Sequence, residues 1–282
     1  MERNRKWVTL VLSMALLLGL SLLLYPTVSN YVNSLATSKA MVDYSQDVSL
    51  LNAEAYEKLL REAREYNASL LKRTNEYTLT PEQEGKYHNM LALRENQVNV
   101  IGHVEIPSID VRLPIYHGTS EWVLQNGVGH LDWTSLPIGG ESTHAVLSGH
   151  RGLPSAELFT KLDQVQAKDI FIIRVLNETM TYEVDWNISV EPGDVAKLTI
   201  KEGEDLCTLV TCTPYAKNTH RMLVRGHRIE NAPEARTVTV TSEAMQIEPM
   251  IVAPLLALPL LFILLVLMLF EGSGKKRARK KE

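Results

Sequence analysis

Two long apolar runs stand near the two ends of the chain. Val8–Tyr25 and Met250–Phe270 are 18 and 21 residues long, and neither contains a charged side chain. A helix needs about 20 apolar residues to cross a bilayer core, with a lower limit of about 17. Both runs therefore predict transmembrane helices, of which the first is the shorter.

The charges beside these runs predict the orientation of the chain. Lys and Arg precede the first run at positions 3–6 and follow the second at positions 275–281. Short segments rich in Lys and Arg stay on the cytoplasmic side of a membrane. We therefore expect a multi-pass protein of the cell membrane, with the lipid bilayer as a partner and an extracytoplasmic domain between the two helices.

The first apolar run has a second interpretation, a cleavable signal peptide. Small residues suited to cleavage occur at Ala36 and Ala40. They lie about ten or more residues beyond the apolar run, which is further than a cleavage region usually lies. We therefore favour an uncleaved anchor.

An amphipathic pattern follows the first run. Between Ser49 and Lys72, apolar side chains recur every three to four positions, with Glu and Arg on the other face. We interpret this as a helix that packs on the domain rather than as a coiled-coil partner site, because the pattern is short. Residues 73–99 are polar and weakly periodic, which predicts a long connection able to act as a flap over a site.

From Val100 onward, the pattern changes to short apolar runs separated by Gly, Pro and Asn. Such runs are typical of a mainly β domain, either a closed antiparallel barrel or a sandwich. One helix is expected around Ser155–Leu162. The predicted strands are Ile101–Ile106, Val111–Tyr116, Thr143–Ser148, Ile170–Leu176, Met180–Val184, Thr208–Thr211 and Met222–Arg225.

The charge of the extracytoplasmic part limits the partners of the protein. Once the cytoplasmic ends are set aside, 20 basic and 30 acidic residues remain. Nucleic acid attracts basic surfaces, so this acidic domain argues against nucleic acid as a partner.

The chain contains two cysteines, Cys207 and Cys212. A cysteine pair outside the cytoplasm ordinarily suggests a disulfide. On one strand these two would lie about 16–17 Å apart and on opposite faces, which is outside disulfide range. We expect Cys207 to pack as a small buried hydrophobe and Cys212 to be a free thiol.

The surroundings of Cys212 predict a reactive thiol. In the β-branched run before Pro214, Thr208, Val210 and Cys212 share one strand face. The chain then returns from Arg221 in a second strand-like pattern, so a hairpin would place Arg221 opposite Cys212. Opposed residues have Cβ atoms about 4.5–5.5 Å apart, and a thiol beside a cation is reactive.

A nucleophilic thiol also needs a proton partner. His150 is the best candidate, because it lies in the loop that leaves the strand Thr143–Ser148. His220 is the main rival, but as the neighbour of Arg221 it faces the other side of the strand. No His-x-x-x-His or Cys-x-x-Cys spacing occurs, so we expect no metal and no cofactor. Six further histidines show no pairing with these groups and are expected to be surface or core residues: His88, His103, His117, His130, His144 and His227.

The residues around these groups resemble the sortases of Gram-positive bacteria, in particular the class C branch that builds pili. The resemblance lies in Leu147–Gly152, Thr208–Tyr215 and Asn218–Arg228, with further similarity in Ile106–Ile109, Leu113–Gly118 and Gly127–Leu131. It covers about Val100 to Ile229. It implies an eight-stranded β-barrel in which Cys212 is the nucleophile, His150 is its proton partner and Arg221 steadies the substrate carbonyl oxygen.

The resemblance also implies a reaction. Cys212 would attack the Thr–Gly bond of an LPxTG-like sorting signal (Leu-Pro-x-Thr-Gly) on a pilin or surface protein and form a thioester. A lysine amine of another pilin subunit would then take the acyl group. Three alternatives stay open: a housekeeping sortase that uses a cell-wall precursor amine, a cysteine peptidase that uses water, and a non-enzymatic membrane-anchored binding module.

One feature of the class C branch is missing from the sequence. Many members carry an Asp-Pro-aromatic lid ahead of the barrel, whereas the only proline of residues 73–99 is Pro81, in Thr80-Pro81-Glu82. Trp133 is a possible substrate-facing aromatic residue, although we favour a packed surface position for it.

These expectations together define the organisation of the chain. The fold class is mainly β: an eight-stranded sortase-type barrel with short helices, preceded by an amphipathic helix and flanked by two transmembrane helices. The expected parts are a basic flank and membrane anchor (1–25), a helical region with a possible lid-like connection (26–99), the catalytic barrel (100–230), a linker (231–249), a transmembrane helix (250–270) and a basic tail (271–282).

Overall fold

The structure is a computed structural model that describes residues 2–71, 78–94 and 99–231. It divides into two units, of which the first contains residues 1–32 and the second the barrel. The predicted second transmembrane helix (250–270) and the basic tail (271–282) lie outside the described residues, as does the linker after residue 231.

The chain begins with one long helix, α1 (Glu2–Ser49). From Val11 it is long and apolar enough to cross a membrane. Large apolar side chains in its N-terminal half are exposed, including Leu16, Leu18 and Leu23. Among the described residues this is the one helix with that character, which agrees with the predicted N-terminal anchor.

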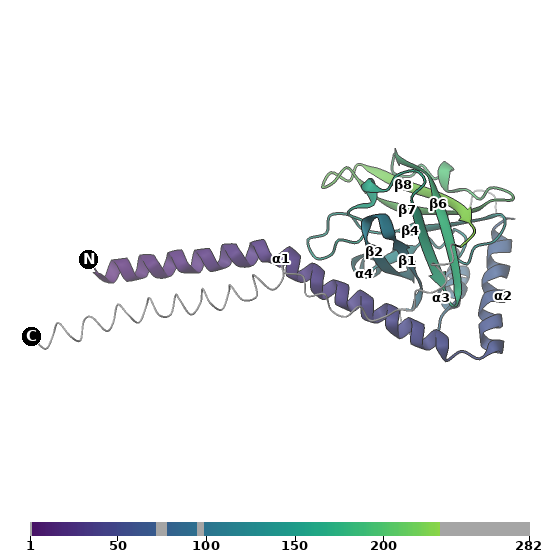
Figure 1. The fold of residues 1–282 in the computed structure, drawn as a ribbon, viewed down its shortest axis with the longest axis horizontal. Helices are drawn as coiled ribbons and strands as arrows, with labels where there is room; N and C mark the ends of the chain where they lie inside the picture. Colours follow the sequence, from purple (N-terminus) through teal and green to yellow (C-terminus); the bar gives the residue numbers. More distant parts are fainter. Residues whose placement is uncertain (1, 72–77, 95–98, 232–282) are drawn as a thin grey trace, which may run out of the picture. The chain divides into compact units, whose positions relative to one another are not determined.

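The second unit is built around a closed barrel of eight strands (Figure 1). The strands are β1 (Val100–Ile106), β2 (Val111–His117), β3 (Val128–His130), β4 (Thr143–Ser148), β5 (Ile170–Val175), β6 (Glu178–Val190), β7 (Asp205–Thr213) and β8 (His220–Ile229). Their order around the barrel is β1-β2-β3-β4-β7-β8-β6-β5. The predicted eight-stranded barrel is confirmed.

The expected antiparallel arrangement is wrong in two places. β2 pairs with β3 in parallel, and β4 pairs with β7 in parallel. Parallel neighbours need a long connection between them. The β4–β7 connection contains β5 and β6. Because β4 and β7 run in parallel, the two strands end at the same edge of the barrel.

Helices α2 (Ala53–Leu70) and α3 (Pro81–Asn89) lie outside the barrel. α2 confirms the predicted amphipathic helix, since its buried side chains include Leu60, Ala63 and Leu70. α3 corrects the expectation of a long irregular connection. Thr80 and Gln83 form a capping box around Pro81, a combination that favours the start of a helix.

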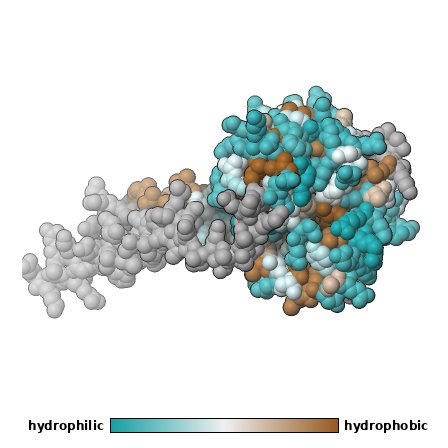
Figure 2. Space-filling model, turned by 45° about the vertical axis from the view of Figure 1, so that its right-hand side comes forward, coloured by the Kyte–Doolittle hydropathy of each residue, from teal (hydrophilic) through white to brown (hydrophobic). Residues whose placement is uncertain are grey.

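The segment expected to be a helix, Ser155–Leu162, contains turns instead. Leu158 has a φ of 41°, and the next regular element is a short 3-10 helix at Leu162–Gln164. A helix that the sequence pattern does not predict, α4 (Glu121–Asn126), starts at the N-cap Ser120. On the face drawn in Figure 2, hydrophilic side chains predominate over scattered apolar patches. This composition is typical of a solvent-exposed protein surface.

Candidate active site

Cys212 lies at the end of β7, on the outer face of the barrel. The alternating residues Cys207 and Leu209 are fully buried and belong to the main core. Because side chains alternate along a strand, Cys212 faces the opposite side from Cys207. Both cysteines are free, and Cys212 is partly exposed. The expectations of a buried Cys207 and no disulfide are confirmed.

Arg221 lies directly opposite Cys212. β7 and β8 pair in antiparallel fashion, with Cys212 opposite Arg221 and Thr213 opposite His220. This register confirms the predicted hairpin. The Nη1 group of Arg221 donates to the carbonyl oxygens of Asn218 and His220, at 3.3 and 3.2 Å. These contacts tie the guanidinium to the turn that joins the two strands.

His150 reaches the same end of the barrel through β4. Ser148 at the end of β4 is level with Val210 of β7. The Gly149 amide then donates to the Val210 carbonyl at 3.0 Å, and the Thr211 hydroxyl donates to the Gly149 carbonyl at 2.8 Å. His150 is two residues beyond Ser148, just as Cys212 is two residues beyond Val210. We call the group formed by Cys212, His150 and Arg221 the strand-end site.

The side chain of His150 is 27% exposed and lies close to the carboxylate of Glu121 in α4. The two groups, His150 Nε2 and Glu121 Oε1, are 3.8 Å apart. Glu121 is 71% exposed, so the attraction is worth only about 0–1 kcal/mol. The sequence pattern does not single out Glu121 as a site residue, although the Ser120-Glu121 pair is typical of a helix start.

The rival histidine, His220, does not share the face of Arg221. It is exposed, and its Nδ1 lies 2.9 Å from the hydroxyl of Thr219. Of the six other histidines, His103, His117, His130 and His144 are buried, as expected for core residues. Burial lowers the pKa of His117 to about 3 and the pKa values of His130 and His144 to about 4. These histidines are poorly suited to exchange protons with a substrate.

No metal site occurs among the described residues: no group of three or more His, Cys, Asp or Glu side chains is placed to hold an ion. The strand-end site therefore offers a thiol, an imidazole and a guanidinium. Such a set suits nucleophilic attack on a carbonyl, since the guanidinium remains charged and donates hydrogen bonds to an oxyanion.

An apolar cluster borders the strand-end site on the outer face. Val210 precedes Cys212 by two residues, and Leu223 follows Arg221 by two, so both share the face of the site. Trp133 packs against this cluster, as favoured from the sequence. The cluster consists of Val146, Leu198, Val210 and Leu223, with Leu131, Trp133, Trp186, Ile188 and Val190 packed against them.

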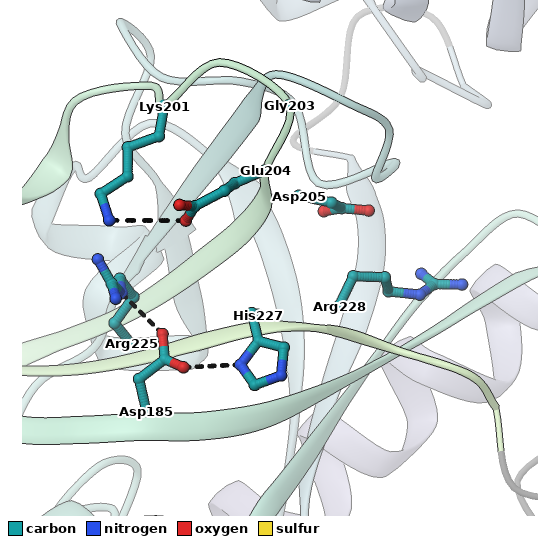
Figure 3. A pocket seen from close by; sticks show the side chains of 8 residues that line it. All are labelled: Asp185, Lys201, Gly203, Glu204, Asp205, Arg225, His227 and Arg228. Atoms are coloured by element: carbon teal, nitrogen blue, oxygen red, sulfur yellow. Dashed lines mark hydrogen bonds and ion pairs between the residues drawn. The ribbon is translucent and has the colours of Figure 1, made fainter.

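A charged pocket of about 500 Å³ lies elsewhere on the barrel (Figure 3). Asp185 accepts a hydrogen bond from Arg225 Nε at 2.9 Å and lies 2.6 Å from His227 Nδ1. Lys201 pairs with Glu204 at 3.6 Å. Opposite charges thus meet one another within the pocket, and none of the three residues of the strand-end site lines it.

The helix α3 takes the place in the chain where a lid was considered. Its Tyr87 is fully buried against β2 and β3, where its hydroxyl lies 2.8 Å from His130 Nδ1. In the described part of the chain, no hydrogen bond or ion pair joins α3 to the strand-end site. α3 packs on the barrel wall through Tyr87, and Cys212 is partly exposed.

Comparison with known proteins places this barrel in a family. The model of the sortase domain matches residues 104–229. The crystal structure of sortase C1 from Streptococcus agalactiae has 46% sequence identity and a TM-score of 0.66, with 69% of this chain and 100% of that chain covered.

Two further relatives extend the comparison. Sortase C from Clostridium perfringens, in a structure with the C-terminal cell wall sorting motif, has 38% identity and a TM-score of 0.60, with 68% of this chain and 99% of that chain covered. Sortase D of Bacillus subtilis strain 168 is 26% identical over 161 residues, which are 56% of this chain and 78% of that protein.

Proposed function

The chain belongs to the sortase family of cysteine transpeptidases, in its class C branch, and we propose that it links pilin subunits through isopeptide bonds. The observation that carries this proposal is the register that places Arg221 opposite Cys212 at the edge where β4 delivers His150. Sortase C1 of Streptococcus agalactiae, which this chain covers in full, supports the class C assignment.

In the proposed first step, the Cys212 thiolate attacks the threonine carbonyl of an LPxTG-like signal. The oxygen becomes an oxyanion, to which Arg221 donates hydrogen bonds. Removal of a single donor of this kind costs about 2.7–4 kcal/mol in other enzymes. His150 gives its proton to the departing glycine amine, and the Thr–Gly bond breaks as the thioester remains.

In the proposed second step, a lysine amine of another subunit attacks the thioester. His150 accepts a proton from that amine, and Arg221 again stabilises the oxyanion. The carbon–sulfur bond breaks, Cys212 leaves as a thiolate, and an amide joins threonine to lysine. Atoms and charges balance without a cofactor or metal.

The apolar cluster beside the site suits the leucine and proline of such a signal. Its members share the outer face with Cys212 and include partly buried Trp186 and Ile188. Burying a leucine side chain there contributes about 1.5–3 kcal/mol. The structure of sortase C from Clostridium perfringens with the C-terminal cell wall sorting motif supports this class of substrate.

The N-terminal helix favours action at a membrane. Its apolar, exposed side chains from Val11 onward fit a lipid environment. We propose that this helix anchors the enzyme, that residues 250–270 form a second anchor, and that the barrel faces the cell wall. Pilin precursors held at the same membrane surface would meet the site at high local concentration.

The direct test uses the full chain in detergent micelles with an LPxTG-containing peptide and lysine-containing pilin fragments. Mass spectrometry of the products should reveal a threonine–lysine isopeptide bond, with Cys212→Ala as the inactive control. Transfer only to a cell-wall precursor amine would favour a housekeeping sortase, and hydrolysis alone would favour a peptidase. Unchanged activity in Cys212→Ala would overturn the catalytic assignment.

A further inference from the structure

The position of the His150 imidazole depends on the loop that begins after β4. Gly149 is held against β7 by the two hydrogen bonds described above. His150 follows it, and its carbonyl accepts a hydrogen bond from the Phe159 amide at 3.1 Å. The contacts of the next residue therefore help to decide where the imidazole stands relative to the thiol.

That next residue, Arg151, joins the two sides of the strand-end site. Its guanidinium pairs with Asp163 through Nη2, and its Nη1 donates to the Thr213 hydroxyl at 3.3 Å. Thr213 directly follows Cys212. A single side chain thus connects the residue after the imidazole to the residue after the thiol.

Arg151 contacts β7 on the side opposite to the Cys212 thiol. Successive side chains on a strand point to opposite faces, so Thr213 lies on the other side of β7 from Cys212. A guanidinium bonded to Thr213 is therefore behind the thiol. The following residue, Gly152, packs on the ring of Tyr215, and a Cβ atom there would lie 2.7 Å from that ring. Close packing at this point leaves the loop little freedom.

Stability alone is a weak reason for a charge at this place. The Arg151 side chain is only 8% exposed, so its charge has lost most of its hydration. Its Nε is buried, with no hydrogen-bond partner in the described part of the chain. Its partner Asp163 is 41% exposed, and ion pairs with an exposed partner contribute little to stability. A geometric role explains the guanidinium better, because its planar fork bonds two partners in fixed directions.

We propose that Arg151 is a positioning residue, which holds the His150 imidazole level with the Cys212 sulfur without touching the substrate. The proposal rests on the proposed function, since it assigns Arg151 to the same transfer reaction. A displacement of about 1 Å can lower an enzymatic rate about 10²-fold. Arg151→Met should therefore lower the rate constant of thioester formation by about 10²-fold, with KM changed by less than about twofold.

Arg174 provides a closely matched control. Its side chain is 11% exposed, and it likewise bonds one carboxylate and one threonine hydroxyl. Its partners are Glu105 at 3.1 Å and Thr179 at 2.9 Å. It lies on β5, a strand that carries none of the three residues of the strand-end site. Arg174→Met removes an equivalent buried cation, so any loss should be confined to stability.

The experiment compares the full-length wild type with Arg151→Met, Arg151→Lys, Thr213→Val and Arg174→Met. Thioester formation with an LPxTG peptide is followed by single-turnover mass spectrometry and corrected for the folded fraction by thermal unfolding. The pH profile of Cys212 alkylation by iodoacetamide is recorded in parallel, because that rate follows the thiolate fraction and hence the nearby imidazole. His150→Ala supplies the reference profile for a missing imidazole.

The proposal expects Arg151→Met to lose about 10²-fold in acylation and to shift its alkylation profile toward that of His150→Ala. Lysine should recover at most about tenfold, because it is a point charge without the planar fork. Thr213→Val, which removes one bond and leaves the charge, should show a smaller loss in the same direction and decides the matter if Arg151→Met does not fold.

A wild-type profile and acylation rate in Arg151→Met, or losses that only parallel those of Arg174→Met, would overturn the proposal. The two tests are separable. If the wild type forms no thioester, the proposed function fails, whereas the alkylation profiles still decide whether Arg151 positions the imidazole.

Discussion

His150 and His130 show how two regions of one barrel give the same side chain different properties. His150 lies just past the end of β4, is 27% exposed and has Glu121 3.8 Å away. His130 ends β3 and is fully buried beneath α3. Burial lowers the pKa of His130 to about 4. One histidine is accessible to solvent, and the other is held neutral.

The hydrogen bonds around His130 fix the tautomer of its neutral ring. Its Nε2 lies 2.8 Å from the Ser135 carbonyl oxygen, so this nitrogen carries the proton. Its Nδ1 is then free to accept from the Tyr87 hydroxyl at 2.8 Å. The Gly118 amide donates to the same hydroxyl at 3.0 Å. The comparison teaches that a histidine buried beneath α3 becomes part of the barrel wall, whereas a histidine at the strand ends stays open to solvent.

The largest expected effect separates the two cysteines. Cys212→Ala should abolish acyl-enzyme formation, because no other exposed thiol exists in the chain. Cys207→Ala should retain it and lose about 1 kcal/mol of stability, since Cys207 is fully buried in the core. Intact-mass spectrometry after incubation with a sorting-signal peptide measures both. An adduct on the Cys212→Ala protein would show that the site lies elsewhere.

The next effect concerns Arg221. Arg221→Lys should lower kcat by about 10²–10³-fold while the protein remains folded, because lysine cannot supply the two fixed donors of a guanidinium. Arg225→Lys, four residues along the same strand face, is the matched control and should keep the wild-type kcat. Steady-state transpeptidation assays provide the comparison, and near-wild-type turnover in Arg221→Lys would remove this residue from the site.

A smaller effect is expected beneath α3. Tyr87→Phe removes the hydroxyl that contacts His130 and the Gly118 amide. Leaving buried polar groups without partners costs about 1–3 kcal/mol. Denaturant titration should show this loss, whereas the rate of thioester formation should not change. A changed rate at constant folded fraction would contradict the division between the two regions.

The last predicted change leaves activity aside and concerns the pH dependence of stability. The pKa of His130 is lowered from 6.5 to about 4, so below pH 6.5 the unfolded chain gains a proton that the folded chain excludes. The free energy of unfolding therefore falls as the pH falls, by up to about 1.4 kcal/mol per unit for this histidine. This loss ends near the folded-state pKa.

The matching variant is His130→Gln, which should reduce that slope, while the contributions of His117 and His144 remain. Their pKa values are lowered in the same direction, also by burial. Unfolding measured by denaturant between pH 7 and pH 5 tests the expectation. An unchanged slope in the variant would show that His130 takes up a proton in the folded state.

Much of the barrel could be predicted from local pattern. The alternating side chains of strand β7 are visible in the sequence. The second strand-like run, which begins at Arg221, identifies β8 as its hairpin partner. By contrast, β3 has only three residues, Val128–His130, which is too short for an alternating pattern. The parallel pairing of β4 with β7 also leaves no local signal, because register between distant strands depends on the packing of the whole barrel.

The wrong helix at Ser155–Leu162 has a backbone cause. Leu158 adopts a positive φ, and Ala156 forms an isolated bridge with Leu153. Tertiary contacts of this kind override an apolar spacing. The opposite error occurred at α3, where Thr80, Pro81 and Gln83 form a capping signal within a polar segment. That capping signal is visible in the sequence and is enough to predict the start of the helix.

The three residues of the strand-end site could be predicted from the sequence, whereas two residues beside them, Arg151 and Glu121, could not. Cys212 and Arg221 are related by a hairpin, which is a local feature, and His150 follows a recognisable strand. Arg151 and Glu121 form ion pairs with residues on other segments of the chain. Their partners are 12 residues or more away along the chain, and only the folded structure brings them together.

The most direct test of the account is an experimental structure of the enzyme trapped as a thioester with a sorting-signal peptide. The account predicts an acyl group on the Cys212 sulfur, its carbonyl oxygen about 2.7–3.1 Å from the Arg221 guanidinium, and the His150 imidazole on the side from which the amine arrives. An imidazole or guanidinium on the opposite wall from that sulfur would contradict it.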